Sequence, residues 1–404
     1  MLRIEMLPAQ EGDCFLISID NQYHILIDGG TTYTYKHFLK SRLQKLAEEN
    51  KKINLLIVSH IDNDHIGGII NLINDNGYAE NPQIISIEEV WHNSYRHLQL
   101  KKNGSLGFQE KEILTSIISS GSTAERMKLF EENEKEISAL QGTSLAGMLY
   151  SLGYSWNKSL NGLVIKNGFR FNIQDDVYLE VIAPDEKTLD DLQKNWKIQL
   201  LRNKIDFQFS DDQIFDDAYE YHMRFFKEVD GKEKDVSYKE KDVISIEELA
   251  TQEYDRDLSV TNNSSICFLL CYKGKKILFL GDICVENLNS CVSQGEYALI
   301  KVPHHGSRKN YTTEFAKNIY AERYLVSTNG KKYNHPDEGA IAKMIYYNAE
   351  KEKNIYFNDF HAQIKNLFPE KKISAYHAAI HMPDKEEIIV VDIEGEAFCE
   401  NHSQ

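Results

Sequence analysis

Short apolar runs separated by turn residues dominate the N-terminal part of the chain. The segments LRIEML, CFLISI and YHILIDGG predict three strands, the last closed by an Asp-Gly-Gly turn. Apolar residues at helical spacing predict an amphipathic helix over 36–52, and NLLIV predicts a fully buried strand before SHIDNDHIGG. The segment IGGIINLINDNG is typical of a helix that stops at Asn-Gly. This β-β-β-α-β-α order indicates a sheet covered by helices.

Strand patterns continue on both sides of a polar stretch. IEEVWHNSYRHL predicts a strand, residues 109–153 contain the helical patterns QEKEILTSIISS and AERMKLFEENEKEISAL, and VIKNGFRFNIQDDVYLEVIAPD predicts strands with an Asn-Gly hairpin. From about 186 to 258 the chain is polar and acidic. Strands follow in NNSSICFLLCY, KKILFLGDI, LIKVP, ERYLV and IIVVDI, with a helix over 337–350. We expect one two-sheet α/β domain over residues 1–404, an insertion over 186–258, and an active site between the halves.

Composition narrows the classes of function. The 404 residues hold 46 Lys+Arg against 62 Asp+Glu, a net charge of −16, which argues against broad electrostatic capture of nucleic acid or of an anionic membrane. Apolar runs are of strand length, and the start MLRIEMLPAQEGDC resembles no signal peptide, so we expect a cytoplasmic protein. The six cysteines form no CxxC pair, which favours reduced thiols.

Acidic residues and histidines gather at four predicted strand ends. Loops at strand ends can present ligands from a rigid base. A mixture of carboxylates and imidazoles binds one or two divalent ions, with a carboxylate left over to bridge them. The candidates are Asp28 after HILI, His60, Asp62, Asp64 and His65 after NLLIV, Asp282 after KILFLG, and His304 and His305 after LIKVP.

Each cluster alone also has an ordinary structural explanation. Asp28 and Asp282 suit turns beside glycine, and Asp64 suits a helix cap. The complete HxDxDH set is not explained in this way, because two nearby carboxylates and two imidazoles need a cation. His304 and His305 would point to opposite faces of a continued strand, so we expect one direct ligand between them.

Together these motifs resemble the metallo-β-lactamase fold superfamily and, more narrowly, the hydrolase domain of ComEC-type competence proteins and their soluble relatives. The resemblance is carried by QEGDCFLI with ILIDGG, SHIDNDHIGG, NNSSICFLL followed by ILFLGD, KVPHHGS and LVSTNGKKYNHP, in the family's order over residues 9–336. It implies a four-layer αβ/βα sandwich with a metal site at the edge between the sheets. It does not cover the acidic insertion or much of 90–160.

The resemblance also implies roles for the matched positions. It makes Asp28 a support that orients the metal loop by hydrogen bonding. Asp64 would hold the nucleophile or accept its proton, and His335 in NHP would contact a substrate phosphate or deliver a proton. Ser307 and Lys309 are candidates for binding a phosphate oxygen, although solvated loops explain GSRKN and NHP equally well. The implied metal ligands are His60, Asp62, Asp64, His65, Asp282 as the bridge, and one of His304 and His305.

Two departures from the family pattern affect the metal. Asp62 stands where the superfamily more often has histidine, although the competence-type subgroup also shows aspartate there. A carboxylate shifts preference from zinc toward manganese or magnesium, so we expect one or two divalent ions, Zn or Mn. The third-motif histidine is missing, and Asp185 in VIAPD or His92 in VWHNS is the candidate replacement.

These observations predict a metal-dependent hydrolase in which metal-activated water attacks without a covalent intermediate. The subgroup implies a phosphodiesterase or nuclease: a soluble bacterial enzyme acting with protein partners in defence or DNA processing, and not at a membrane. The acidic composition opposes this, although RHLQLKKNG, GSRKN and NGKK could form a local basic strip. The alternatives are a hydrolase of a small phosphoester or other ester, and a catalytically weak binding or regulatory module that keeps the fold.

Overall fold

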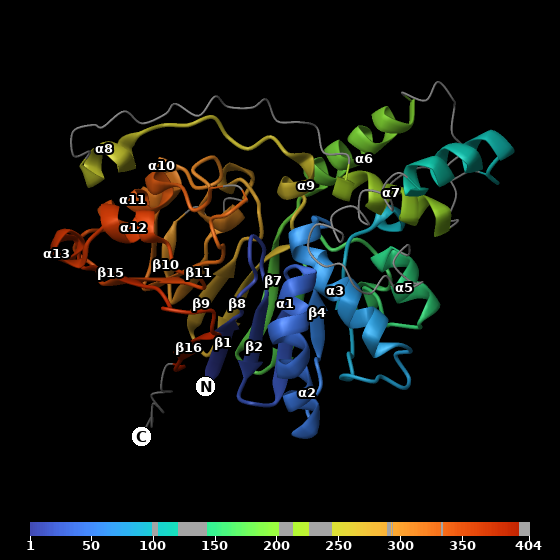
Figure 1. Ribbon diagram of the computed structural model, residues 1–404, viewed down its shortest axis with the longest axis horizontal. Coiled ribbons are helices and arrows are strands. Elements are labelled where there is room, and N and C mark those ends of the chain that lie inside the picture. Colours follow the sequence, from blue (N-terminus) through green and yellow to red (C-terminus); the bar gives the residue numbers. More distant parts are fainter. Residues whose placement is uncertain are drawn as a thin grey trace, which may run out of the picture.

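The computed structural model describes residues 1–98, 104–119, 144–201, 213–225, 245–288, 292, 294–332 and 334–395. Within them the strands form two large mixed sheets and one two-stranded sheet. Figure 1 shows the N-terminal strands and helices on one side of the molecule and the C-terminal ones on the other. The helical pattern predicted over 124–140 and residues 99–103 of the basic piece RHLQLKKNG lie outside the described residues.

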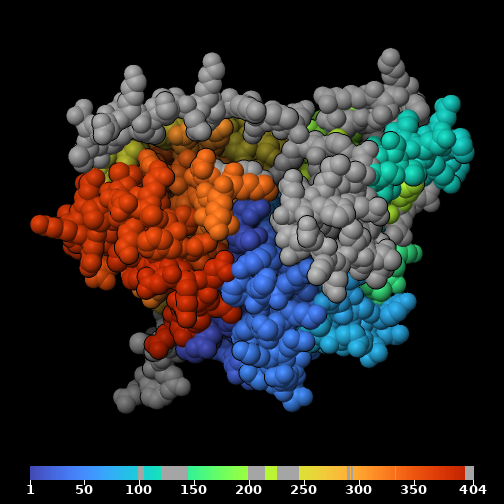
Figure 2. All heavy atoms as spheres, in the orientation of Figure 1, coloured from blue at the N-terminus to red at the C-terminus, as the bar shows by residue number. Residues whose placement is uncertain are grey.

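The first sheet has six strands in the order β16-β1-β2-β3-β4-β5. Neighbours are antiparallel from β16 to β3 and parallel from β3 to β5. The late strand β16 therefore lies beside β1, and Figure 2 shows the red C-terminal part against the blue N-terminal part. The strands are β1 (Leu2–Met6), β2 (Phe15–Ile19), β3 (Tyr23–Ile27), β4 (Leu55–Ile57), β5 (Val90–Trp91) and β16 (Ile389–Ile393).

The second sheet has eight strands in the order β15-β14-β13-β11-β9-β8-β7-β6. Its neighbours are antiparallel from β6 to β9 and parallel from β9 to β15. The strands are β6 (Arg170–Gln174), β7 (Val177–Ala183), β8 (Cys267–Tyr272), β9 (Lys275–Phe279), β11 (Leu299–Lys301), β13 (Arg323–Val326), β14 (Lys353–Phe357) and β15 (Ala378–His381); the small sheet pairs β10 (Gly295–Tyr297) with β12 (Ile319–Ala321).

The two sheets share a core. In β2, Phe15 and Ile17 face it, while Leu16 between them joins the core under the helices of the first half. In β9, Phe279 faces the shared core and Leu278 faces the helices of the second half. The rings of Phe15 and Phe279 meet edge to face with centroids 5.6 Å apart. Because successive side chains point to opposite faces, strands buried on both faces read as continuous apolar runs.

Helices cover the outer face of each sheet, so the expected four-layer αβ/βα sandwich is confirmed. Among the described helices, none combines the length and the apolar character needed to cross a membrane. The first half carries α1 (Thr32–Thr34), a π-helical turn (Tyr35–Leu39), α2 (Lys40–Glu48), α3 (Asn63–Asn76), a helix over 108–119 and α5 (Leu145–Ser151). The second carries α10 (Thr313–Asn318), α11 (Glu338–Tyr346), α12 (Ala362–Leu367) and α13 (Glu370–Ile373).

The strand predicted over 87–98 is wrong beyond its first part. Only Val90 and Trp91 form a strand, and the chain then turns at Ser94 into a 3-10 helix (Tyr95–His97). Asp216 explains the turn, because it accepts hydrogen bonds from the Ser94 hydroxyl (2.9 Å) and the backbone N–H of Arg96 (3.1 Å). A tertiary contact here outweighs the local strand preference.

The hairpin between β6 and β7 also differs from the prediction. Its turn lies at Asp175-Asp176, because Gln174 pairs with Val177, and Asp176 adopts φ 58°. Aspartate tolerates this left-handed conformation better than most residues. The predicted Asn-Gly pair lies at the opposite end of the hairpin, where the N–H of Gly168 donates to the carbonyl of Val181.

The acidic stretch 186–258 packs apolar side chains into the protein. It contains α6 (Glu186–Leu201), α7 (Gln213–Phe225) and α8 (Ile246–Thr251). Trp196, Phe215 and Tyr219 are buried in the same cluster as residues of α3 and α5. The helices of this stretch are therefore amphipathic, although its composition is acidic. That residues 186–258 form an insertion stays a proposal.

The backbone of α3 lies so close to the turn after β3 that an alanine should destabilise the protein at Gly68 but not at Gly67. A Cβ at Gly68 would lie 2.0 Å from the carbonyl oxygen of Gly29, whereas at Gly67 it would meet nothing closer than 3.5 Å. Gly68→Ala is expected to lower the free energy of unfolding by about 2 kcal/mol or more. Gly67→Ala, the matched control, is expected to leave it unchanged or raise it by up to about 1 kcal/mol. Urea denaturation of both variants tests this, and equal effects would contradict it.

Candidate metal centre

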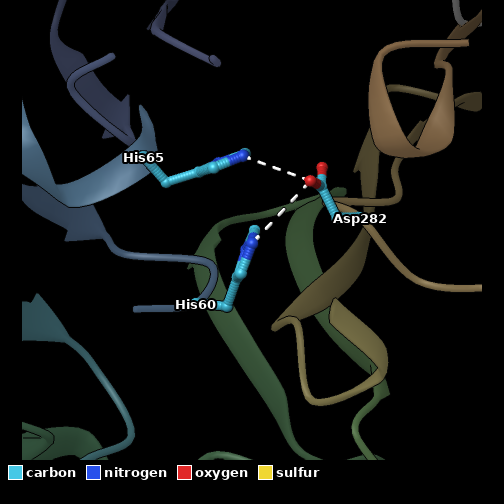
Figure 3. Close-up of side chains that lie close together, drawn as sticks. All are labelled: His60, His65 and Asp282. Atoms are coloured by element: carbon cyan, nitrogen blue, oxygen red, sulfur yellow. Dashed lines mark ion pairs between the residues drawn. The ribbon is translucent and has the colours of Figure 1, made fainter. Parts of the chain in front are cut away.

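Loops at strand ends bring the predicted ligands to one place between the two sheets. Asp28 follows β3 and His60 follows β4 in the first sheet, while Asp282 follows β9 and His304 follows β11 in the second. In Figure 3, His60 and His65 point from the N-terminal half toward Asp282 of the C-terminal half. The cluster therefore joins residues more than 200 positions apart in the chain.

The carboxylate of Asp282 lies at the centre of this cluster. Its side chain is 3% exposed, whereas that of His304, at the outer edge, is 22% exposed. One oxygen faces four imidazoles: Oδ2 lies 3.3 Å from His65 Nε2, 3.4 Å from His305 Nε2, 3.7 Å from His60 Nε2 and 3.9 Å from His304 Nε2.

Outer hydrogen bonds fix the orientation of the two N-terminal histidines. The Nδ1 atom of His65 lies 2.8 Å from Asp28 Oδ2, so this nitrogen carries the proton. The Ser59 hydroxyl donates to the same Asp28 oxygen (2.6 Å), which leaves its own oxygen to accept from His60 Nδ1 (3.0 Å). With Nδ1 protonated, each ring turns the lone pair of Nε2 toward Asp282.

The two C-terminal histidines are held in the same sense. His305 Nδ1 donates to the carbonyl of Ser327 (2.8 Å), and His304 Nδ1 faces the side-chain oxygen of Asn310 (2.9 Å). The strand ends at Lys301, and both histidines take left-handed φ values of 44° and 56°. The alternation of a continued strand therefore does not apply, and both rings approach Asp282. The prediction of a single direct ligand between them stays a prediction.

The geometry fits a divalent cation. The Nε2 atoms of His60, His65 and His305 are buried, and none has a hydrogen-bond partner in the described structure. Buried imidazole lone pairs beside carboxylates form a donor set that suits Zn or Mn. Ligand atoms within 4.8 Å of one another occur in four groups: His60, His65 and Asp282; Asp64, His65 and His305; Asp13, Asp28 and His65; and Asp13, Asp282 and His305.

The carboxylates of the cluster raise the pKa of two of its buried histidines. Burial alone would lower the pKa of His305, but the carboxylates of Asp282 and Asp13 raise it to about 10. The pKa of His65 is likewise raised well above its usual value, because Asp282 and Asp28 outweigh burial. Without metal these rings bind protons, so metal binding must displace them.

The two aspartates of the HxDxDH motif occupy different positions. Asp62 is the N-cap residue of α3, but its side chain makes no capping hydrogen bond, and its Oδ2 lies 3.4 Å from His60 Nε2. Asp64 lies in the first turn of α3 and does not cap it; its Oδ2 is 4.0 Å from His305 Nε2. Its side chain is 12% exposed, so it borders the outer side of the cluster.

The predicted substrate-contacting residues lie around the KVPHHGS turn. The ring of His335 is 5.2 Å from that of His304, and its Nδ1 lies 3.5 Å from Asp337 Oδ2. Ser307 is buried, and its hydroxyl oxygen accepts from the backbone N–H of Lys309 at 3.3 Å. Lys309 is half-buried. Contacts of these residues with substrate stay predictions.

The two candidates for the missing third-motif histidine lie outside the groups of metal-ligating atoms found in the described structure. His92 stacks on Trp156 with an interplanar angle of 15°, and burial lowers its pKa to about 3. Asp185 accepts hydrogen bonds from the N–H and the hydroxyl of Thr188, both at 2.7 Å, as a cap of α6 does.

Sequence reasoning missed two buried residues of the cluster. Lys301, at the end of β11, pairs with Asp13 from the loop before β2, and its Nζ lies 3.7 Å from Asp282 Oδ1. Both side chains are at most 2% exposed. Their signals were a lysine inside the apolar run LIKV and an aspartate directly before the strand CFLISI.

The acidic stretch also reaches the metal loop. Arg224 of α7 is buried, and its Nη2 donates to Asn63 Oδ1 at 2.7 Å. Asn63 stands between Asp62 and Asp64, so α7 packs directly against the loop that carries the candidate ligands.

Comparison with known proteins adds independent evidence. A family model described as the metallo-beta-lactamase superfamily matches residues 7–80. This segment contains the loop of Asp13, the turn after β3 and the HxDxDH motif. With the architecture described above, the match confirms the metallo-β-lactamase fold expected from the sequence. A comparison with curated protein sequences finds no match.

The solved structures that match this chain have low sequence identity to it and TM-scores below 0.5. They include a candidate metal-dependent hydrolase from Parabacteroides distasonis (9% identity, TM-score 0.34, 94% of this chain and 93% of that one). Zn(2+)-bound PqqB from Methylobacterium extorquens has 8% identity and a TM-score of 0.38, and the match covers 97% of this chain and 100% of that one. A long form RNase Z from yeast has 9% identity and a TM-score of 0.31, and the match covers 89% of this chain and 37% of that one. Likeness at this level does not indicate what this chain acts on.

Proposed function

We propose that this protein is a metal-dependent hydrolase of the metallo-β-lactamase superfamily that cleaves phosphodiester bonds, with nucleic acid as the leading substrate. One observation carries the proposal: four histidines, each held at Nδ1 from outside, turn Nε2 toward the single carboxylate of Asp282. Three of these nitrogens, in His60, His65 and His305, are buried beside one shared carboxylate, and this combination of imidazoles and carboxylate is the donor set that a divalent cation needs.

The residues present divide the work of hydrolysis. His60, His65, His305 and Asp282 would hold the first ion, with Asp62, Asp13 and His304 near enough to complete the site or to bind a second ion. A bound divalent ion lowers the pKa of a coordinated water toward about 7 and stabilises negative charge. Asp64, at the outer side, would orient the attacking water and accept its proton. His335, beside His304, would contact a phosphate oxygen or protonate the leaving group.

A nuclease assay tests the proposal directly. In the presence of Mn²⁺ the wild-type protein is expected to cleave single- or double-stranded DNA, and Asp64→Ala is expected to lose activity by a factor of about 10² or more, because the proton acceptor is gone. Asp191→Ala, on the exposed face of α6, serves as a control that should cleave normally. Equal cleavage by wild type and Asp64→Ala would remove the proposal.

Hydrolysis of a small phosphoester is the second candidate, favoured by the depth of the cluster. The side chains of His60, His65 and His305 are at most 1% exposed, and the net charge of −16 repels a polyanion. Cleavage of bis(p-nitrophenyl) phosphate without cleavage of DNA would favour it. A protein that retains no divalent ion and gains no thermal stability from Mn²⁺ or Zn²⁺ would instead indicate a binding module.

A further inference from the structure

The ring of His304 is the most exposed of the four histidines and lies at the edge of the cluster. It is the only one of them more than 5% exposed, and its Nε2 is the most distant from Asp282 Oδ2, at 3.9 Å. It also follows the end of β11, in a left-handed backbone conformation, so no strand fixes its ring. The orientation of its ring therefore depends on the groups that contact Nδ1.

Asp257 provides that contact from a distant part of the chain. Its Oδ2 lies 3.2 Å from His304 Nδ1, and its side chain is 6% exposed. The carboxylate is itself held in place: Ser259 N–H donates to Oδ1 (2.9 Å), and the amides of Asn262 (2.8 Å) and Asn310 (3.0 Å) donate to Oδ2. A buried carboxylate with three such donors is rigid enough to orient an imidazole.

The hydrogen-bond network also determines which nitrogen of His304 carries the proton. The amide group of Asn310 donates to Asp257 Oδ2 and to the carbonyl of Asp282, both at 3.0 Å. Its oxygen must therefore face His304 Nδ1, at 2.9 Å. Both atoms next to Nδ1 are acceptors, so Nδ1 is protonated and Nε2 points its lone pair at the cluster.

The segment that carries Asp257 supports other candidate ligands as well. It leads into α9 (Val260–Asn263) and then to Ser265. The hydroxyl oxygen of Ser265 faces His60 Nδ1 (3.3 Å) and accepts from the N–H of Asp282 (3.1 Å). Residues 257–265 therefore contact the cluster from outside at three points.

We propose that Asp257 is a positioning residue of the metal site, which holds His304 with Nε2 directed toward the metal. The inference rests on the proposed function only in needing a metal at this cluster; it does not depend on the substrate. A carboxylate that orients a ligating histidine usually changes metal affinity by about 10- to 100-fold. Asp257 would make His304 a direct ligand of the metal.

Three variants test the proposal by Mn²⁺ titration calorimetry. Asp257→Asn is expected to lower Mn²⁺ affinity by about 10- to 100-fold, because the neutral amide removes the negative charge that keeps the imidazole proton on Nδ1 of His304. The pair Asp257→Asn/Asn310→Asp returns a carboxylate to the same nitrogen, and most of the affinity is expected to return. Asp216→Asn is the matched control: this carboxylate is buried and accepts from Ser94 and Arg96, so stability should fall without a change in affinity.

The outcomes separate this proposal from the proposed function. Wild-type affinity in Asp257→Asn, or equal weakening in the single and paired variants, would overturn it. If the single variant does not fold, the paired variant decides: retained affinity supports the proposal and lost affinity overturns it. Metal binding without hydrolysis of any ester removes only the proposed function. A wild-type protein that binds no ion would overturn both this proposal and the proposed function.

Discussion

Asp282→Asn is expected to lower Mn²⁺ affinity by more than about 100-fold and hydrolytic activity by a factor on the order of 10³. The carboxylate faces four imidazole Nε2 atoms at 3.3–3.9 Å, so a cation held by any of these imidazoles would lie next to it. Asparagine keeps the size of the side chain but removes its charge. Its amide nitrogen cannot bind a cation in place of the second oxygen.

Metal content by elemental analysis, together with turnover of the preferred ester, measures this effect. Asp185→Asn is the matched control, because its carboxylate caps α6 through Thr188. It is expected to cost about 1 kcal/mol of stability or less and to leave metal content unchanged. Full metal content and activity in Asp282→Asn would show that the metal is bound without Asp282.

Lys301→Met is expected to lower the free energy of unfolding of the metal-free protein by about 3–5 kcal/mol. Lys301 and Asp13 form a buried ion pair between the two sheets, and the ammonium also donates to the carbonyl of Gly281 at 2.8 Å. Burial would lower the pKa of Lys301, but the carboxylates of Asp13 and Asp282 raise it, so the ammonium stays charged. Without it, the buried carboxylate of Asp13 loses its ammonium partner and has only imidazole nitrogens beside it as cationic neighbours, His305 Nδ1 at 3.5 Å and His65 Nδ1 at 4.0 Å.

The double variant Asp13→Leu/Lys301→Met distinguishes the loss of the ion pair itself from the cost of leaving the Asp13 carboxylate buried without its partner. Replacing both charges by apolar groups of similar size is often neutral or stabilising, so most of the lost stability should return. Urea denaturation in the presence of a chelator measures all three proteins without a contribution from metal binding. A loss below about 1 kcal/mol in Lys301→Met would show that the pair is not a structural bridge.

Local patterns predicted most of the elements of the sandwich but not their exact ends. The apolar runs around Phe15 and Phe279 were clear because each alternating face is buried. The turn at Asp176 and the short strand at Val90 were missed. After Val90 a partner distant in sequence, Asp216, decides the conformation, and a window of neighbouring residues does not contain that partner.

The candidate ligands were visible because their chemistry is concentrated in short motifs. His60, Asp62, Asp64 and His65 stand within six positions, and Asp282 and His304 follow apolar runs in the same way. The supporting residues carried weaker signals. Asp257 lies in the acidic stretch DRDLS, where one aspartate does not differ from its neighbours.

The sequence by itself determined the residue types and the strand ends that carry them, and it led us to expect a cation. Only the tertiary structure decided which atoms meet: that Nδ1 of each histidine points outward, that both His304 and His305 reach Asp282, and that Lys301 lies buried beside it. The reason is physical. Strand periodicity is a local property of the backbone, whereas the direction of a side chain at a strand end depends on hydrogen bonds and charges supplied by distant segments.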